Sequence, residues 1–293
     1  MIRRLFLVSI AALLFHVSHT TYAAELSNVA YSSLSALPQS EPSLRLTYGA
    51  EALQFIDVWK ASNALHDDKP ALIFIHGGCW LNAYDLNHAR GLYKALSDRG
   101  VDVYAVEYRR AGDEGGGWPG SRNDVTSALQ YLSTYWQNTT MPHSITLAGH
   151  SAGGHLALLA LQDDTIVDRL PLNKVVGLAA ITDITAYAQG KNSCQTATKV
   201  FMGGMPIAIQ THTSEYSQAQ QNTQAAYIEA TPVIDTPMLP VILLQGDADA
   251  IVSREHASLA GATPRIIKAG GHFDWLHPKT PSFNAFYQEL IKQ

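Results

Sequence analysis

The sequence predicts an α/β fold in which a mostly parallel central sheet carries helices on both faces. Apolar runs with strand character alternate along the chain with helical stretches, as repeated β-α-β units require. The run over 71–75 is continuously apolar, which is typical of a strand covered on both faces. The length of 293 residues suits one such core with an insertion.

The expected elements follow from these patterns and from the breaks between them. After an irregular lead-in over 25–50, the expected strands cover 53–59, 71–75, 101–108, 145–148, 175–181, 238–244 and 265–268. The expected helices cover 87–98, 123–136, 152–161, 254–260 and 283–291. Gly100 ends the first helix, and glycines with Pro119 separate the third strand from the second helix.

One segment, residues 184–231, is too long for an ordinary connection between two strands. It is rich in Gln, Thr, Ala and Gly and lies between the strands at 175–181 and 238–244. Ligands of open α/β sheets bind beyond the carboxyl ends of the strands, so we predict that this insertion is a short lid over a site there. The alternative is a surface excursion with no part in the chemistry.

Composition and charge narrow the class of protein. Hydrophobic residues make up 46% and charged residues 15%, which excludes a disordered, collagen-like or coiled-coil chain. The formal net charge is -5 and no cluster of Lys and Arg occurs, so we expect no nucleic-acid partner. Two cysteines cannot build a multi-bridge scaffold, so the fold must depend on its core.

Residues 1–24 have the pattern of a signal peptide. Arg3 and Arg4 precede an apolar run over 5–15, and small residues follow near a plausible cleavage site. The run is too short to span a bilayer as a helix, which takes roughly 20 residues. We therefore expect a periplasmic or secreted mature chain over 25–293 with no membrane span. An uncleaved membrane anchor is the alternative.

The segment Gly149–Gly153 has the G-x-S-x-G pattern of a nucleophile elbow. It lies directly after an expected strand and directly before an expected helix, which is the context that such an elbow requires. A sharp turn there would expose the Ser151 hydroxyl at the carboxyl edge of the sheet, and the flanking glycines leave room for the neighbouring chain. The alternative is a strand–helix turn whose serine only caps the helix.

A second glycine motif, His76–Trp80, directly follows the strand at 71–75. Acyl transfer builds negative charge on a carbonyl oxygen, and each aimed N–H donor in a dry site is typically worth roughly 3 kcal/mol. We predict an oxyanion hole made by the N–H groups of Gly78, Cys79 and Ala152. Alone, this motif could be a plain turn. Together with the nucleophile elbow, it is a strong signal for an oxyanion hole.

The remaining catalytic candidates follow the last two expected strands. Asp249 comes after the strand at 238–244 and His272 after the strand at 265–268. A serine needs a base to take its proton, and the base needs a carboxylate to orient it. We predict Ser151, His272 and Asp249 in these roles, with Asp247 as the alternative acid. Four other groups are expected to be structural or surface residues: His155, His256, Asp274 and His277.

Trp80 and Trp275 flank these motifs and are candidate substrate-binding residues, with packing in the core as the alternative. Cys79 and Cys194 lie 115 positions apart, so the sequence does not decide whether they meet. Two free thiols are the favoured expectation, and a disulfide that joins the insertion to the loop over 76–80 is the alternative. No convincing metal-ligand spacing occurs, so we expect no metal and no cofactor.

Over residues 50–292 the chain resembles α/β-hydrolases of the esterase and lipase type. It is most similar to secreted bacterial esterases of the acetylxylan- and feruloyl-esterase-like group, and to kynurenine formamidase and hormone-sensitive-lipase relatives. The resemblance rests on His76–Trp80, Glu107–Arg110, Gly116–Gly120 with Asp124–Val125, Gly149–His155, Gly246 with Asp249 and Val252, and Gly271–Phe273. It favours Asp249 over Asp247 as the acid. Cys79 departs from the relatives, which often carry Gly or Tyr there.

These patterns together predict a secreted serine hydrolase that cleaves small carboxylic esters through an acyl-enzyme without a cofactor. An amidase, such as an arylformamidase or a peptidase, would use the same three side chains and is the alternative. A non-catalytic binding protein on a hydrolase fold is a further alternative. The oligomeric state and the acyl and alcohol specificity stay open.

Overall fold

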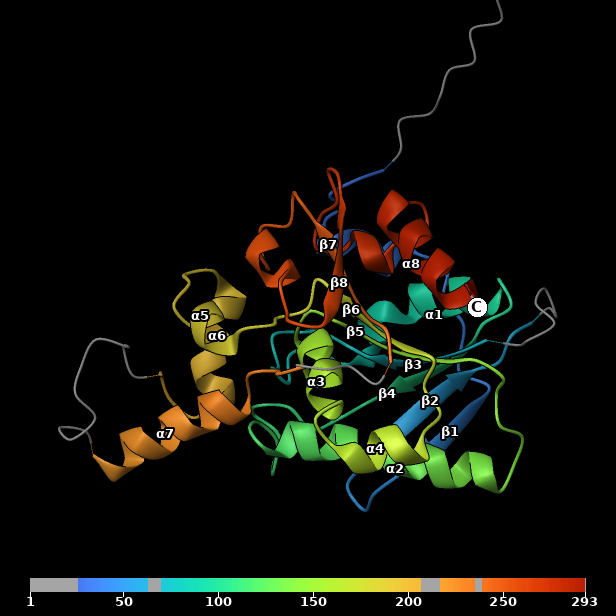
Figure 1. Cartoon of the computed structure of the whole chain (residues 1–293). Helices are drawn as coiled ribbons and strands as arrows, with labels where there is room; N and C mark the ends of the chain where they lie inside the picture. The colour runs from blue at the N-terminus through green and yellow to red at the C-terminus, as the bar shows by residue number, and fades with distance from the viewer. Residues whose placement is uncertain (1–25, 63–69, 207–216, 235–238, 293) are drawn as a thin grey trace, which may run out of the picture.

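The centre of the molecule is a twisted sheet with the strand order β1-β2-β4-β3-β5-β6-β7-β8 (Figure 1). The computed structural model of the chain describes residues 26–62, 70–206, 217–234 and 239–292, so the expected signal peptide over 1–24 lies outside the described residues. The strands are β1 (Leu44–Thr47), β2 (Phe55–Trp59), β3 (Ala71–Ile75), β4 (Asp102–Val106), β5 (Ile145–His150), β6 (Lys174–Leu178), β7 (Val241–Gly246) and β8 (Ala262–Ile267).

Strands β3 to β8 run parallel to one another, whereas β2 pairs antiparallel with both β4 and the edge strand β1. This confirms the predicted mostly parallel sheet. Strand β1 was not expected, because the segment 25–50 has only weak periodicity. It is four residues long and buries only Leu46, as an edge strand with one covered side chain does.

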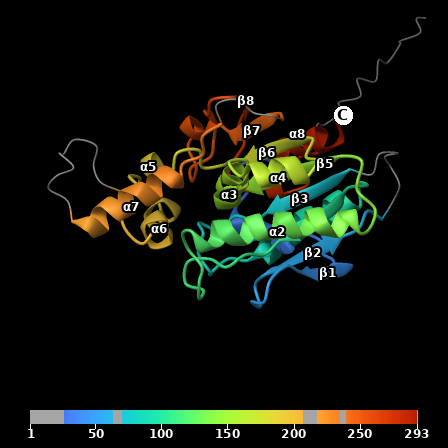
Figure 2. The same cartoon turned by 60° about the horizontal axis from the view of Figure 1, so that its bottom comes forward.

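Helices cover both faces of the sheet, as expected (Figures 1 and 2). One face carries α2 (Gly120–Gln137), α3 (Ala152–Ala160) and α4 (Asp164–Arg169), and the other carries α1 (Arg90–Ser97) and α8 (Pro281–Ile291). Helix α4 was not expected. The helix expected over 254–260 is only the short 3-10 turn η4 (Arg254–Ala257), and η2 (Leu86–Ala89) precedes α1.

The inner strands β3, β5, β6 and β7 are buried along their whole length. Their continuous apolar runs fit strands with helices on both sides. Because these strands are parallel, the loops after β3, β5, β7 and β8 leave the sheet at one edge. That edge is where the three separated sequence motifs come together.

The segment between β6 and β7 contains α5 (Ile184–Tyr187), α6 (Ser193–Phe201) and α7 (Gln218–Glu229). These helices pack on one another and project beside the sheet (Figure 1, left). Asn192 and Ser217 each begin the following helix with a reciprocal capping box. Whether this insertion acts as a lid stays a prediction.

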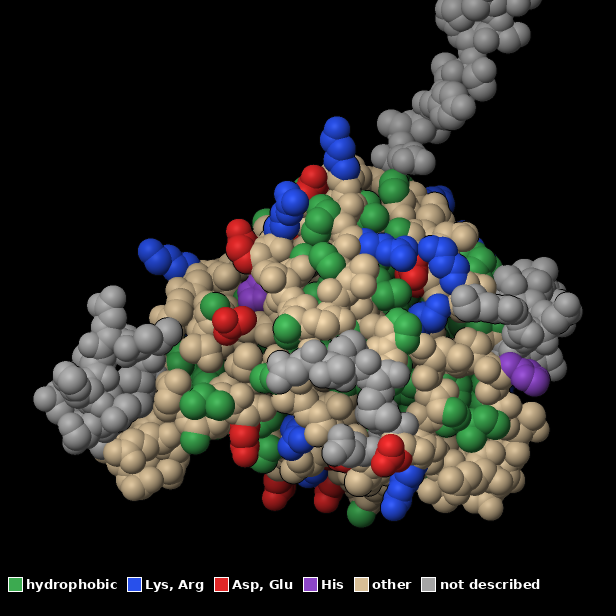
Figure 3. Space-filling view, viewed as in Figure 1, with side chains coloured by type: hydrophobic (Ala, Val, Ile, Leu, Met, Phe, Trp, Pro, Cys, Tyr) green, Lys and Arg blue, Asp and Glu red, His purple; other side chains and the backbone are tan. Residues whose placement is uncertain are grey.

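One face of the molecule carries charges of both signs (Figure 3). On the face seen in Figure 3, Lys and Arg alternate with Asp and Glu without forming one large patch of either sign. In the part of the chain that the structure describes, no helix is long and apolar enough to cross a membrane.

Candidate active site

Ser151 occupies a strained turn between β5 and α3, with φ 55° and ψ -120°. A non-glycine residue with this backbone costs of order 1–3 kcal/mol, and such strain is concentrated at functional sites. The flanking glycines are needed for packing: a Cβ at Gly149 would lie 2.2 Å from the Gly153 oxygen, and one at Gly153 would lie 2.2 Å from the Ile75 oxygen. Among the described residues, the Ser151 side chain makes no capping hydrogen bond to α3, so the helix-cap alternative is not what the structure shows.

His272 and Asp249 lie in hydrogen-bond contact, with 2.8 Å between Nδ1 of the imidazole and Oδ2 of the carboxylate. The other carboxylate oxygen of Asp249 accepts from the N–H groups of Ile251 and Val252, at 2.8 and 2.9 Å. A carboxylate facing Nδ1 keeps the proton there and leaves Nε2 free to accept another. The alternative acid, Asp247, instead accepts from the Ala269 N–H at 2.6 Å.

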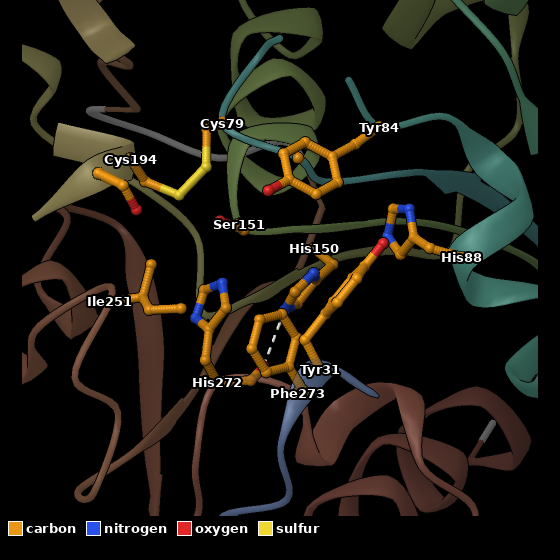
Figure 4. A pocket seen from close by; sticks show the side chains of 12 residues that line it. Tyr31, Cys79, Tyr84, His88, His150, Ser151, Cys194, Ile251, His272 and Phe273 are labelled. Carbon is orange, nitrogen blue, oxygen red and sulfur yellow. Dashed lines mark hydrogen bonds between the residues drawn. A yellow bond between two sulfur atoms is a disulfide. The ribbon is translucent and has the colours of Figure 1, made fainter. Parts of the chain in front are cut away.

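Ser151 and His272 line the same cavity, which has a volume of about 240 Å³ (Figure 4). The predicted hydroxyl and imidazole, which are 121 positions apart in the sequence, therefore face one space. Gly78 and Cys79 also line this cavity.

The predicted oxyanion loop, residues 76–80 and called the oxyanion loop below, has an unusual backbone. Gly78, Cys79 and Trp80 follow one another in the left-handed region, with φ values of 120°, 54° and 59°. A Cβ at Gly78 would lie 2.5 Å from the Cβ of Tyr84, so glycine is required there. Ala152 is the first residue of α3, and its N–H is among those that a helix leaves without an intrahelical partner. The predicted donors thus come from a strained loop beside the cavity and from the helix that follows Ser151.

A buried contact between an imidazole and a carboxylate supports this loop. Nε2 of His76 lies 3.0 Å from Oε1 of Glu107, and the His76 ring stacks on Tyr108 with centroids 4.4 Å apart. The Tyr108 hydroxyl donates to the His76 carbonyl oxygen at 2.9 Å. Burial alone would raise the pKa of Glu107, but His76 and Arg110 outweigh it, so the pKa is lowered. Glu107 and Tyr108 therefore support the loop through His76.

His150, which the sequence analysis did not single out, links two of the catalytic loops. Its Nε2 donates to the backbone carbonyl of His272 at 2.8 Å. Burial lowers the pKa of His150 well below its usual value, so the ring is neutral and donates from Nε2 only. The residue before Ser151 thus holds the main chain of His272, a contact between positions that no local pattern connects.

Cys79 and Cys194 form a disulfide, with 4.9 Å between their Cα atoms. The expectation of two free thiols is wrong. Cys194 lies in the first turn of α6, and both Ser193 and Cys194 line the cavity. The bridge therefore joins the insertion to the oxyanion loop and makes the start of α6 part of the cavity wall.

The two candidate substrate-binding tryptophans lie elsewhere. Trp80 and Trp275 are both 0% exposed and belong to the core, so the prediction that they line the cavity is corrected. The Trp80 ring stacks on Phe201 and donates from Nε1 to Nδ1 of His155 at 3.3 Å. Position next to a motif does not determine which side of the loop a side chain packs on.

The other groups expected to be structural or on the surface are buried. His256 and His277 are each 7% exposed rather than on the surface, and Asp274 is fully buried. Nδ1 of His256 accepts from the Thr182 N–H at 3.3 Å. In the residues that the structure covers, no group of three or more His, Cys, Asp or Glu side chains is placed to hold a metal ion.

Aromatic side chains that the sequence analysis missed form much of the remaining cavity wall. Tyr31, Tyr84, His88 and Phe273 line the cavity together with the residues named above (Figure 4). They come from the start of η1 in the N-terminal segment, from the loop after β3, from η2 and from the residue after His272. No signal in the sequence joins these segments, because they are adjacent only in the folded chain.

Comparison with known proteins places the chain in a family. Residues 56–262 match the family model described as BD-FAE. Esterase LipC of Mycobacterium tuberculosis is 30% identical over 117 residues, which are 40% of this chain and 28% of that protein. Kynurenine formamidase of Drosophila melanogaster is 28% identical over 122 residues, 42% of this chain and 39% of that protein. The match thus spans less than half of the length of either relative.

Solved structures agree in fold over nearly the whole chain. Esterase B from Lactobacillus rhamnosis has a TM-score of 0.64 at 17% identity, covering 89% of this chain and 88% of that one. An esterase from Pyrobaculum calidifontis has a TM-score of 0.62 at 14% identity, covering 88% and 86%. The architecture is that of the α/β-hydrolase esterases, and the chain belongs to the BD-FAE family.

Proposed function

We propose that this protein is a serine hydrolase that cleaves carboxylic esters, with Ser151 as nucleophile, His272 as base and Asp249 as the orienting acid. The observation that carries the proposal is the shared cavity. It brings a serine on a strained strand–helix turn together with an imidazole whose Nδ1 is held at 2.8 Å by a carboxylate. Family membership supports the same reaction class.

The reaction follows from these positions. The Ser151 oxygen attacks the ester carbonyl carbon while Nε2 of His272 takes the hydroxyl proton. N–H groups of Gly78, Cys79 and Ala152 stabilise the resulting oxyanion. The C–O bond to the alcohol then breaks, and the alcohol leaves with the proton from His272.

An acyl-enzyme on Ser151 remains after this first half of the reaction. Water attacks its carbonyl carbon and gives a proton to His272. The ester bond to Ser151 breaks, the carboxylic acid leaves, and the serine oxygen regains the proton. Asp249 stabilises the imidazolium in both halves.

Replacing the nucleophile tests the assignment. Ser151→Ala should lower kcat for 4-nitrophenyl acetate by at least about 10⁴-fold, because the remaining oxyanion donors and binding give only residual catalysis. Ser193→Ala is the matched control, since Ser193 lines the same cavity from α6. It should keep more than about a tenth of the wild-type kcat. Substantial turnover by Ser151→Ala would contradict the proposal.

Amide hydrolysis is the second candidate, because one relative is named kynurenine formamidase. The same three side chains serve both reactions, and only the leaving group differs. Matched acetates and anilides of one aromatic ring system separate the two candidates. A kcat/KM for the ester far above that for the anilide supports an esterase, and the reverse ranking supports an amidase.

We also propose that the protein is exported and that residues 1–24 are removed. The disulfide between Cys79 and Cys194 supports this, since such bridges persist in oxidising compartments. Expression of the full chain in a bacterium with a periplasm, followed by N-terminal sequencing, tests it. A new N-terminus close to residue 25 in the periplasmic fraction is expected; an intact Met1 in the cytoplasm would contradict it.

The insertion at 184–231 is proposed to be a lid whose fixed end is the start of α6. Cys194 is bonded to the oxyanion loop and lines the cavity, which supports a covering role for this part. Limited proteolysis with and without a bound phosphonate tests the idea. Slower cleavage within the insertion in the phosphonate complex is expected, and equal cleavage rates would contradict it.

A further inference from the structure

Two cavities meet at one wall beside the catalytic serine. The catalytic cavity has a volume of about 240 Å³, and a second cavity of about 420 Å³ lies next to it. Tyr31, Tyr84 and His88 line both of them. These three residues, here called the aromatic wall, form the boundary that the two cavities share. The aromatic wall therefore sets how far the catalytic cavity extends in this direction.

Tyr31 is the member of this wall that comes from outside the hydrolase core. It begins the 3-10 helix η1 (Tyr31–Ala36) in the N-terminal segment. Its ring meets Tyr84 edge-on at 5.8 Å between centroids and Phe273 at 5.3 Å. In Figure 4 the Tyr31 side chain stands between Phe273 and His88. Phe273 directly follows the catalytic histidine, so Tyr31 packs against the loop that carries the base.

A buried carboxylate holds the N-terminal segment in this place. Asp274 is fully buried, and its two oxygens accept from the N–H groups of Asn28 and Val29, each at 2.8 Å. It also accepts from the Gly271 N–H at 3.0 Å. One side chain therefore fastens the segment before Tyr31 to the loop around His272, and these contacts are here called the Asp274 latch.

Two members of the aromatic wall, Tyr31 and His88, carry no charge near neutral pH. Burial lowers the pKa of His88 to about 4, with His76 adding to the shift, so the ring is neutral. Burial raises the pKa of Tyr31, so its hydroxyl keeps its proton. The wall must therefore act on a substrate by its bulk rather than by charge.

Tyr31 is also the member that can be removed with least disturbance. It is 41% exposed, whereas His88 is half-buried beside His76 and Tyr84 packs on the required glycine Gly78. Loss of its ring would join the catalytic cavity to the space beyond it.

We propose that Tyr31 is a specificity-determining residue, which limits the length of the ester group that the catalytic cavity accepts. The inference rests on the proposed esterase function. It adds that Tyr31, in the N-terminal segment held by Asp274, is the boundary between a site for short ester groups and the neighbouring cavity.

Chain-length selectivity tests the proposal on both parts of the ester. The acyl group is lengthened from 4-nitrophenyl acetate to 4-nitrophenyl heptanoate, and the alcohol from methyl acetate to heptyl acetate. The measured quantity is the ratio of kcat/KM for the long ester to that for the short one, which cancels effects common to both. The variants are Tyr31→Ala and Tyr31→Phe. Tyr131→Ala is the matched control, because Tyr131 lies on α2 and stacks on Tyr135 away from the site.

In Tyr31→Ala the long-to-short ratio should rise about tenfold or more in at least one of the two series, as expected when a steric limit is removed from a pocket. In Tyr31→Phe and in Tyr131→Ala it should stay within about twofold of the wild type. If Tyr31→Ala gave the same long-to-short ratio as the wild type in both series, this inference would be overturned and the proposed function would be unaffected. Failure of the wild type to hydrolyse any of these esters would overturn the proposed function and this inference with it.

Discussion

The catalytic cavity has two walls that lie outside the central sheet, and the two are fastened in different ways. On one side, α6 of the insertion is joined covalently to the oxyanion loop by the Cys79–Cys194 bridge. On the other side, the N-terminal segment is held by the Asp274 latch, which consists of hydrogen bonds from backbone N–H groups to one carboxylate. The first fastening acts next to the predicted oxyanion donors, and the second next to the loop of the base.

This difference suggests separate roles for the two walls. An oxyanion donor contributes chiefly in the transition state, so loosening the bridge should lower kcat. The latch positions Tyr31, which borders the cavity but belongs to none of the reacting groups. Loosening it should therefore change which esters are accepted. Each prediction below tests one side of this division.

The largest effect is expected from removing the bridge. Cys194→Ser frees the Cys79 backbone, so kcat for 4-nitrophenyl acetate should fall at least about tenfold and at most by the roughly 10²–10³-fold that follows complete loss of an oxyanion donor. The free energy of unfolding should fall by about 2–5 kcal/mol. Steady-state kinetics and denaturant titration measure both quantities.

Chemical reduction provides the control for this variant. Dithiothreitol should bring the wild type to the kcat of Cys194→Ser and should leave that variant unaffected, because it has no bridge left to reduce. A wild-type kcat in Cys194→Ser would show that the bridge does not position the oxyanion loop.

A smaller effect is expected from the latch. In Asp274→Asn one acceptor oxygen becomes an NH₂ group, so either the Val29 N–H or the N–H groups of Asn28 and Gly271 lose their partner. The free energy of unfolding should fall by about 1–3 kcal/mol, and the long-to-short ester ratio should rise as in Tyr31→Ala. Thermal denaturation and the two ester series measure these changes.

Asp247→Asn is the matched control for the latch. Asp247 accepts one backbone N–H, from Ala269, at an exposed position. Its replacement should leave the ester ratio at the wild-type value and should also retain turnover, since Asp249 faces the imidazole instead. An unchanged ester ratio in a folded Asp274→Asn protein would contradict the role of the latch.

The smallest effect is expected on the free energy of unfolding at acidic pH, through a contact between the core and the end of the insertion. Nε2 of His155 donates to the Ala230 carbonyl at the end of α7, and burial lowers the pKa of His155 to about 4. The unfolded chain takes up this proton near pH 6.5, but the folded protein does so only near its lowered pKa. The stability from this group is therefore complete above about pH 6.5 and is lost as pH falls toward about 4.

At about pH 5 the loss should reach roughly 2 kcal/mol relative to neutral pH. Urea unfolding at the two pH values should show a loss in His155→Gln that is smaller than the wild-type loss by about this amount, because other buried histidines such as His88 and His150 contribute to the loss in both proteins. The control is His143→Gln, which changes an exposed histidine and should lose as much stability as the wild type. If His155→Gln and the wild type lost the same free energy of unfolding at low pH, His155 would not be a cause of this loss.

Local patterns predicted the elements that depend on neighbouring residues. Strand β3 matches its expected bounds, and the turn around Ser151 was recognisable because the strand, the glycines and the helix are contiguous. Asp249 and His272 were found because each follows a strand that ends at the same edge. Strand β1 has too few buried side chains to give such a signal.

Features that depend on distant contacts were missed or wrongly predicted. Tyr31 meets Phe273 across 242 positions, and Cys79 meets Cys194 across 115, so neither contact leaves a spacing pattern. Trp80 was expected at the substrate because it is adjacent to the oxyanion glycines, yet it packs on Phe201 in the core. The sheet brings the catalytic loops together, whereas the walls of the cavity depend on contacts that only the folded chain reveals.

The identity of the nucleophile is tested most directly by covalent labelling. A fluorophosphonate should add once per chain, and peptide mass spectrometry should find it on Ser151, with activity lost in proportion to labelling. Ser151→Ala should take up no label although Ser193 still lines the cavity. Label on Ser193, or an unlabelled wild type, would contradict the central claim that Ser151 is activated by His272.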